Sequence, residues 1–105
     1  MDKRTALNKI ATFRRELERQ GIQVDELILY GSYATDTFGE YSDIDLIVIS
    51  GSFRDMNFWQ RIDVMSKAIM KEMAPIEPVA FSPEEWQSGN SLLKGFAENG
   101  ISVLH

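Results

Sequence analysis

Two aspartates separated by a single residue give the chain its clearest chemical signal. Asp43 and Asp45 open an apolar run, residues 44–49, that is typical of a β-strand. Successive side chains of a strand point to opposite faces, so we expect both aspartates on one face, with their Cα atoms about 7 Å apart. Carboxylates this close repel each other, and a divalent cation would convert the repulsion into binding affinity. Because the chain has no Cys and no nearby His, oxygen ligands of this kind favour Mg²⁺ or Mn²⁺.

A glycine–serine turn precedes the aspartates and has the features of a phosphate-binding turn. Gly31 and Ser32 follow a second apolar run, residues 27–30. Glycine allows a tight turn and a close approach of phosphate, since it has no Cβ, and the serine hydroxyl adds a donor. If residues 32–34 open a short helix, its free N–H groups would also face the phosphates. A Gly-Ser pair alone is an ordinary turn, whereas a strand, Gly-Ser and then Asp-x-Asp opening a second strand is a much rarer combination.

Hydrophobic periodicity predicts the elements that would position these residues. A helix over residues 3–20, with Gly21 as its C-terminal cap, would cover one face of a sheet. Strands are expected over residues 23–30 and 44–50, the second of them central because it is apolar on both faces. A second long helix is expected over residues 55–73, with a buried stripe formed by Phe58, Ile62, Met65, Ile69 and Met73. Trp59 and Met56, near its start, are the residues that could instead reach solvent and contact a partner.

The last third of the chain adds one more acidic strand and short helices. Residues 76–81 are expected to form a strand, and Pro78 favours a place at the sheet edge. Glu77 on this strand is either a solvated edge charge or a third acidic site residue. Residues 82–85 have the form of a capping box, so Glu85 is better explained as a helix cap than as a catalytic group. After a break at residues 89–91, we expect a helix over 92–98 and a short strand over 101–104.

Composition limits the class of protein. The chain has 105 residues, 44% hydrophobic and 26% charged, which predicts one small globular domain. The absence of Cys fits a reducing compartment, and no apolar run approaches membrane-spanning length, so we expect a soluble, cytoplasmic protein that contacts no membrane. A net charge of −5 argues against direct nucleic-acid binding. Lys and Arg concentrate in the first twenty residues, as a solvated helix face or as a docking surface for an acidic partner.

The combination of Gly31-Ser32-Tyr33-Ala34 with Ser42-Asp43-Ile44-Asp45-Leu46 resembles the signature of the DNA polymerase β-like nucleotidyltransferase superfamily. The chain looks most like the minimal nucleotidyltransferases, which are often encoded beside a helical HEPN partner. The resemblance covers almost the whole chain and implies an α+β fold, a mixed sheet flanked by helices, in a single small domain over residues 1–105.

The resemblance also implies an activity and its residues. It implies Mg²⁺-dependent (or Mn²⁺-dependent) transfer of a nucleoside monophosphate, AMP from ATP, to a hydroxyl group. Gly31 and Ser32 would bind the phosphates, Asp43 and Asp45 would bind the metal, and Glu77 matches the family's third acidic residue, a metal ligand and candidate base. Because so small a fold leaves little room for an acceptor pocket, the implied acceptor is another protein: a tyrosine of a HEPN-type toxin, with this chain as the antitoxin.

Alternatives remain at the level of sequence. Many family members carry a basic residue and then glycine after the Gly-Ser-x-Ala run, whereas this chain has Thr35 and Asp36, which we expect to weaken nucleotide binding. A non-catalytic module that neutralises its partner by docking is therefore the second hypothesis. A small-molecule acceptor such as an aminoglycoside is a further option. A phosphatase with an Asp-x-Asp nucleophile fits poorly because its acids follow a strand, and an EF-hand lacks the required glycine and bidentate Glu.

Overall fold

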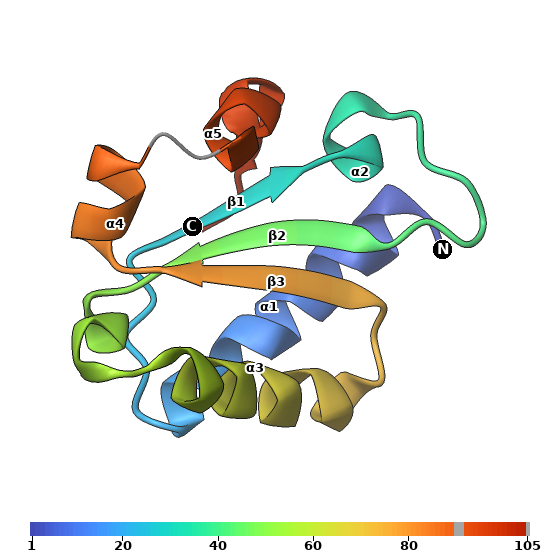
Figure 1. Ribbon diagram of the computed structural model, residues 1–105. Helices are drawn as coiled ribbons and strands as arrows, with labels where there is room; N and C mark the ends of the chain where they lie inside the picture. The colour runs from blue at the N-terminus through green and yellow to red at the C-terminus, as the bar shows by residue number, and fades with distance from the viewer. Residues whose placement is uncertain (90–91, 105) are drawn as a thin grey trace.

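A four-stranded mixed sheet separates two groups of helices in the computed structural model, which describes residues 1–89 and 92–104 (Figure 1). The strand order is β3-β2-β1-β4; β2 pairs parallel with β3 and antiparallel with β1, which pairs antiparallel with β4. This confirms the α+β class and the central place of the Asp45 strand. The elements are α1 (Lys3–Arg19), β1 (Glu26–Tyr30), α2 (Ser32–Thr35), β2 (Ile44–Ile49), η1 (Gly51–Asp55), α3 (Phe58–Glu72), β3 (Ile76–Phe81), α4 (Pro83–Ser88), α5 (Leu92–Phe96), η2 (Ala97–Asn99) and β4 (Ile101–Ser102).

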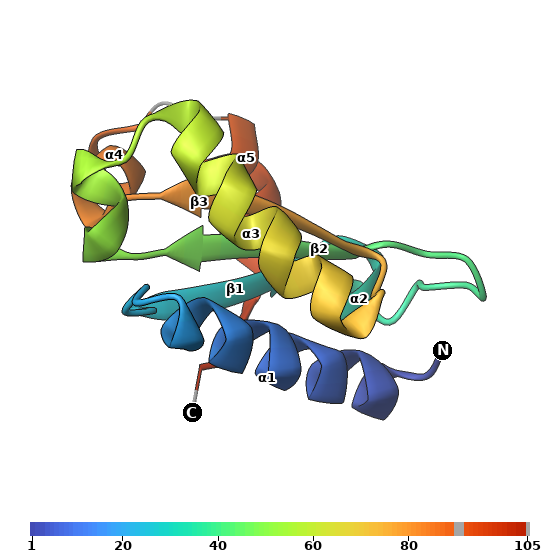
Figure 2. The ribbon, with the colours of Figure 1, turned by 90° about the horizontal axis from the view of Figure 1, so that it is seen from below.

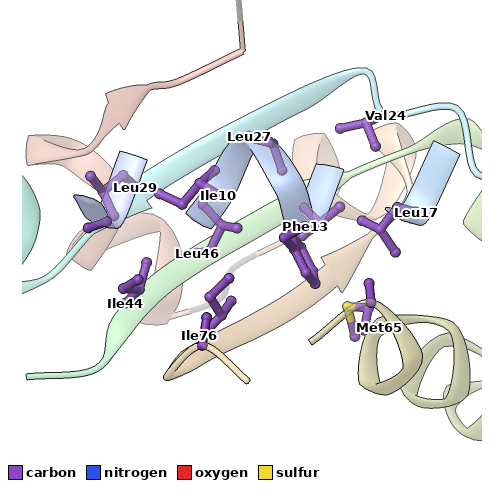
Figure 3. Close-up of a cluster of buried hydrophobic side chains, with 14 of the residues drawn as sticks. Ile10, Phe13, Leu17, Val24, Leu27, Leu29, Ile44, Leu46, Met65 and Ile76 are labelled. Atoms are coloured by element: carbon purple, nitrogen blue, oxygen red, sulfur yellow. The ribbon is translucent and has the colours of Figure 1, made fainter. Parts of the chain in front are cut away.

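Helices α1 and α3 cover one face of the sheet, and α4 and α5 lie on the other (Figure 2). Helix α1 has a buried apolar stripe that packs on the inward side chains of β1 and β2 and is formed by Ala6, Ile10, Phe13 and Leu17. Ile10, Phe13 and Leu17 of this stripe point toward the strands in Figure 3. The helix begins at an Asp2 cap and is followed by Gly21, whose φ of +87° is the left-handed conformation expected after a helix end.

The strands follow the sequence pattern with one shift. The first strand begins at Glu26 and not at the predicted Gln23. The backbone of Gln23 forms hydrogen bonds with serine side chains instead of with the backbone of a neighbouring strand. The N–H of Gln23 donates to Ser52 Oγ at 3.0 Å, and Ser50 Oγ donates to the Gln23 carbonyl. The third strand has the predicted bounds and lies at the sheet edge.

Pro78 interrupts no ladder bond in this edge strand. Amides of Ile44 and Ser50 donate to the carbonyls of Pro75 and Phe81. In a parallel pair only every second residue of a strand forms hydrogen bonds with the neighbouring strand, and in β3 these are the odd-numbered residues. The Pro78 nitrogen therefore points away from β2, and its missing N–H removes no bond between the strands.

The second long helix differs from its prediction in both start and buried face. It begins at Phe58, after an Asn57 cap that forms a capping box with Gln60, and not at Asp55, which belongs to η1. Of the predicted stripe, Met65 is buried and Ile69 half-buried, whereas Phe58, Ile62 and Met73 are exposed. The helix turns the side of Met65 and the small Ala68 toward α1 and the sheet, since Ala68 permits close approach. Trp59 reaches solvent, as the sequence allowed.

The C-terminal elements match the predicted order. Helix α4 begins with the expected capping box between Ser82 and Glu85, and Trp86 packs against Phe81 of β3. Part of the expected chain break, at Asn90-Ser91, lies outside the described residues. Across the described part of the chain, no helix has the length and apolar character needed to cross a bilayer. The cytoplasmic location stays a prediction.

Candidate active site

The sheet register lines up three polar side chains across three strands. Tyr30 of β1 is paired with Asp45 of β2, and Asp45 is paired with Glu77 of β3. Ile44 and Leu46 point into the core beneath α1 and α3, so strand alternation directs Asp45 to the opposite face. The row of Tyr30, Asp45 and Glu77 therefore crosses the sheet face that α1 and α3 leave uncovered.

Asp43 joins this row from the segment just before β2. Its carboxylate is exposed. The negative charge of Asp43 is the main reason that the pKa of Glu77 lies above its ordinary value, followed by desolvation and by the hydrogen bond that a protonated Glu77 can donate to Asp43. The pKa of Asp45 is raised mainly by desolvation and then by the charge of Asp43. The two predicted aspartates and Glu77 thus lie within electrostatic range of one another.

Tyr30 was not predicted as part of this group. The pKa of its phenol is raised by desolvation first and then by the charges of Asp45 and Glu77. A signal for it exists in the sequence, since an antiparallel partner of the Asp45 strand must present alternate residues to the same face. The pairing register that selects Tyr30 is, however, a property of the folded sheet.

Gly31 brings the turn and the carboxylate together. It is the N-terminal cap residue of α2, in a backbone conformation with φ +74° and ψ −152° that side chains strongly disfavour. A Cβ at this position would overlap the Asp45 carboxylate, so only glycine lets the turn and Asp45 lie this close. The predicted short helix after Gly31 is present as α2, and its first amides have no intrahelical partner.

A cavity of about 360 Å³ lies over this contact. It contains the predicted Gly31, Ser32 and Asp45 together with groups that the sequence did not identify, and its full lining is Tyr30, Gly31, Ser32, Thr35, Thr37, Asp45 and Asn99. The Thr35 and Thr37 hydroxyl oxygens lie 2.9 Å apart. Asn99 reaches the cavity because the following strand, β4, pairs with β1. This pairing is a tertiary contact that the local sequence pattern does not predict.

The negative charge of Asp36, next to Thr35, is paired with a cation that the local sequence does not show. Asp36 takes a left-handed conformation (φ 58°) at the end of α2, and its carboxylate accepts a hydrogen bond from Lys3 Nζ at 2.9 Å. A cation from α1 therefore lies beside the added carboxylate. Lys3 therefore offsets part of the negative charge that Asp36 adds to this loop.

The donor chemistry of the site fits a hard divalent cation. All three carboxyl groups offer oxygen ligands. The pKa of Asp45 is raised by desolvation and then by the charge of Asp43, and the pKa of Glu77 is raised by the charge of Asp43 first. Among residues 1–89 and 92–104, no group of three or more acidic or histidine side chains is arranged so that it could hold a metal ion. Mg²⁺ in such sites takes its remaining ligands from water and phosphate, so a partial protein set is compatible with it.

In a comparison with known protein families, residues 7–86 match the family described as nucleotidyltransferase domain. Similar solved structures include a proposed nucleotidyltransferase from Sulfolobus solfataricus, with 17% sequence identity, a TM-score of 0.70, and coverage of 95% of this chain and 80% of the other. Another is a toxin–antitoxin structure solved with AMP-PNP, with 23% identity, a TM-score of 0.63, and coverage of 93% of this chain and 72% of the other. At these identities the two structures establish the fold alone. No protein of curated function matches the sequence.

Proposed function

The chain belongs to the nucleotidyltransferase domain family, and we propose that it transfers a nucleoside monophosphate from a nucleoside triphosphate to a hydroxyl acceptor. The observation that carries this proposal is the contact between Gly31 and Asp45 inside one cavity. A turn open to phosphate and a carboxylate suited to a cation are thereby held side by side. Phosphoryl transfer depends on such positioning and charge neutralisation, with no need for a protein nucleophile.

The polar residues predicted for the site each have a part in this proposal. Ser32 and the first amides of α2 bind the terminal phosphates. Asp43, Asp45 and Glu77 are the residues that would hold Mg²⁺ or Mn²⁺, which when bound neutralises charge on the phosphates and lowers the pKa of a bound hydroxyl.

Glu77 is the proposed base. Its raised pKa makes it a better proton acceptor than an ordinary carboxylate. As the acceptor oxygen forms a bond to the α-phosphorus, its proton passes to Glu77. The bond between the α-phosphorus and the oxygen bridging to the β-phosphorus breaks, and pyrophosphate leaves.

We extend the proposal to the substrate and the acceptor. The triphosphate is ATP and the acceptor is a tyrosine of a HEPN-type toxin, so that this chain acts as the antitoxin. The motif resemblance supports this, as does the similarity to a toxin–antitoxin structure solved with an ATP analogue. The cavity of about 360 Å³ also leaves little space for an acceptor beyond the nucleotide, which favours an acceptor presented on another protein.

A second candidate function keeps the fold without the chemistry. Thr35 and Asp36 leave the cavity without a cation directly after α2, so a module that neutralises its partner by docking alone is the alternative. The Lys3–Asp36 ion pair favours transfer over docking, because it returns a positive charge to this loop.

Transfer of label from α-labelled ATP to a co-expressed HEPN-type partner, with Mg²⁺ present, tests the proposal. We expect label on the partner, and loss of labelling in Asp43→Ala and Asp45→Ala. Asp55→Ala, which removes an exposed carboxylate of η1, is the matched control and should label normally. If the chain forms a tight complex with the partner but the partner never acquires label, the transfer hypothesis would be rejected in favour of docking.

A further inference from the structure

Helix α3 exposes large apolar side chains along one continuous face. Their exposed fractions are 64% for Phe58, 74% for Trp59, 37% for Ile62, 69% for Met70 and 83% for Met73. At 100° per residue Phe58, Trp59, Ile62 and Met70 lie within about a third of the helix circumference, and Ser66 lies in the same arc. Met73 follows them as the C-cap residue of α3. We call this set of six residues the α3 face; it contains no charged residue.

The α3 face is larger than a single chain needs. Its side chains expose on the order of 600 Å² of mainly apolar surface, which is at the upper end for a monomer and near what each partner buries in a standard protein interface. Trp, Phe and Met are also the residue types enriched in interfaces. The size and composition therefore indicate a surface that another protein covers.

The arrangement of residues on this face is self-complementary. If two copies of α3 cross antiparallel at residue 65, Phe58 of one copy lies within one residue of the position opposite Met73 of the other, and Trp59 lies within one residue of the position opposite Met70. Both are aromatic–sulfur pairs, which are favourable contacts. The small Ser66 lies one residue from the crossing point, where two helices must approach most closely.

The charged residues at the border of the α3 face are also complementary in this antiparallel arrangement. Asp63 and Lys67 are exposed neighbours of the α3 face and form an ion pair at 2.9 Å within one helix. In the antiparallel arrangement Asp63 of each copy lies opposite Lys67 of the other, since a twofold axis brings equivalent borders together. The border charges therefore alternate in sign, and no like charges meet.

We propose that the chain forms a twofold dimer in which the α3 face of one copy covers that of the other. The occupant is a second copy because the apolar pairs and the border charges are satisfied by one and the same register. Helix α3 covers one face of the sheet (Figure 2), and strand alternation directs Asp45 to the other face, so dimerisation leaves both sites open. The dimer does not depend on the proposed activity.

Molar mass in solution tests the proposal directly. The 12.0 kDa chain should appear at about 24 kDa, twice that mass, when sedimentation or light scattering is measured up to several hundred micromolar. Ile62→Glu should shift the dissociation constant by at least tenfold toward monomer. Leu7→Glu is the matched control, because Leu7 of α1 is 38% exposed and Ile62 is 37% exposed, and it should leave the dimer intact.

A cysteine test avoids any change to the apolar side chains. The chain has no Cys, so Ser66→Cys introduces a single thiol one residue from the crossing point and should form a disulfide dimer under mild oxidation. Ser88→Cys, on exposed α4, should remain monomeric in a denaturing gel. A 12.0 kDa species at every concentration, or equal cross-linking of both variants, would overturn the proposal and assign the α3 face to a different partner.

Discussion

The α-carbon of Gly31 packs against the carboxylate of Asp45, so that a Cβ at position 31 would overlap Asp45 Oδ2 and lie 3.1 Å from Cγ. The turn after β1 and the acidic residue of β2 are thus fixed by one contact across adjacent strands. The backbone at Gly31 adds a second constraint, since its φ of +74° is strained for any residue with a Cβ. Two separate requirements for glycine coincide at the centre of the candidate site.

Gly31→Ala should therefore harm both stability and activity. We expect the free energy of unfolding to fall by on the order of 2–4 kcal/mol, from backbone strain and displacement of Asp45 together. Nucleotidyl transfer should fall about 100-fold, because a shift of about 1 Å in a catalytic group has that effect. Chemical denaturation and the labelling assay measure the two losses.

Gly21→Ala is the control that separates strain from overlap. Gly21 also has a positive φ, +87°, but a Cβ there meets no atom within 4 Å. It should lose about 1 kcal/mol of stability and keep its activity. Equal losses of activity in the two variants would mean that the Gly31–Asp45 contact has no functional part.

Removing the charge of Asp43 should stabilise the protein at neutral pH. The raised pKa values of Glu77 and Asp45 contribute stability that is fully present below their ordinary pKa values and is lost as pH rises through the raised ones. Asp43→Asn removes the negative charge that is the largest cause of the raised pKa of Glu77. At pH values above the raised pKa values, the free energy of unfolding of the variant should therefore exceed that of wild type by up to about 1 kcal/mol, since these groups are exposed. Thermal unfolding from pH 4 to 8 measures the difference.

The gain should disappear as the pH falls through the raised pKa values of Asp45 and Glu77, because their protonation removes the repulsion. Asp55→Asn removes an exposed charge from η1 and should show no gain at any pH. A variant Asp43→Asn that is less stable than wild type at pH 8 would show that Asp43 stabilises the fold and that repulsion within the acidic group is unimportant.

The position of the acidic row was largely predictable, and its surroundings were not. Alternation along β2 correctly assigned Ile44 and Leu46 to the core and Asp45 to the other face, because a two-residue period is a local property of strands. Asn99 enters the cavity only through the pairing of β4 with β1, which is a tertiary contact. Phe58, Ile62 and Met73 of the α3 face were predicted as buried because periodicity finds an apolar face without saying which neighbour covers it.

Addition of Mg²⁺ should raise the thermal unfolding temperature of the wild-type chain at neutral pH. A ligand at 100 times its dissociation constant adds about 2.7 kcal/mol when it binds only the folded state. Binding between Asp43, Asp45 and Glu77 also removes the repulsion that raises the pKa values of Asp45 and Glu77. Asp45→Asn should lose most of the Mg²⁺-dependent increase, whereas Asp55→Asn should keep it; equal increases in both variants would place the cation elsewhere.

The ion pair between Lys3 Nζ and Asp36 Oδ1, at 2.9 Å, should govern ATP affinity more than stability. Asp36 lies between Thr35 and Thr37 of the cavity lining, so Lys3→Ala leaves an unpaired negative charge near the phosphates. We expect a five- to tenfold weaker ATP affinity, roughly 1 kcal/mol, measured by calorimetry with Mg²⁺. Because the pair is largely exposed, the free energy of unfolding should change by less than about 0.5 kcal/mol.

A double-mutant cycle distinguishes this from a direct contact between Lys3 and ATP. If Lys3 acts by neutralising Asp36, Lys3→Ala combined with Asp36→Ala should recover most of the affinity lost in Lys3→Ala alone. If Lys3 binds phosphate itself, the double variant should stay as weak as the single one. Lys9→Ala is the matched control, since Lys9 also lies on α1 and pairs with Glu72 at 3.7 Å on the face that packs against α3. Its ATP affinity should equal that of wild type, because its charge lies across the sheet from the cavity.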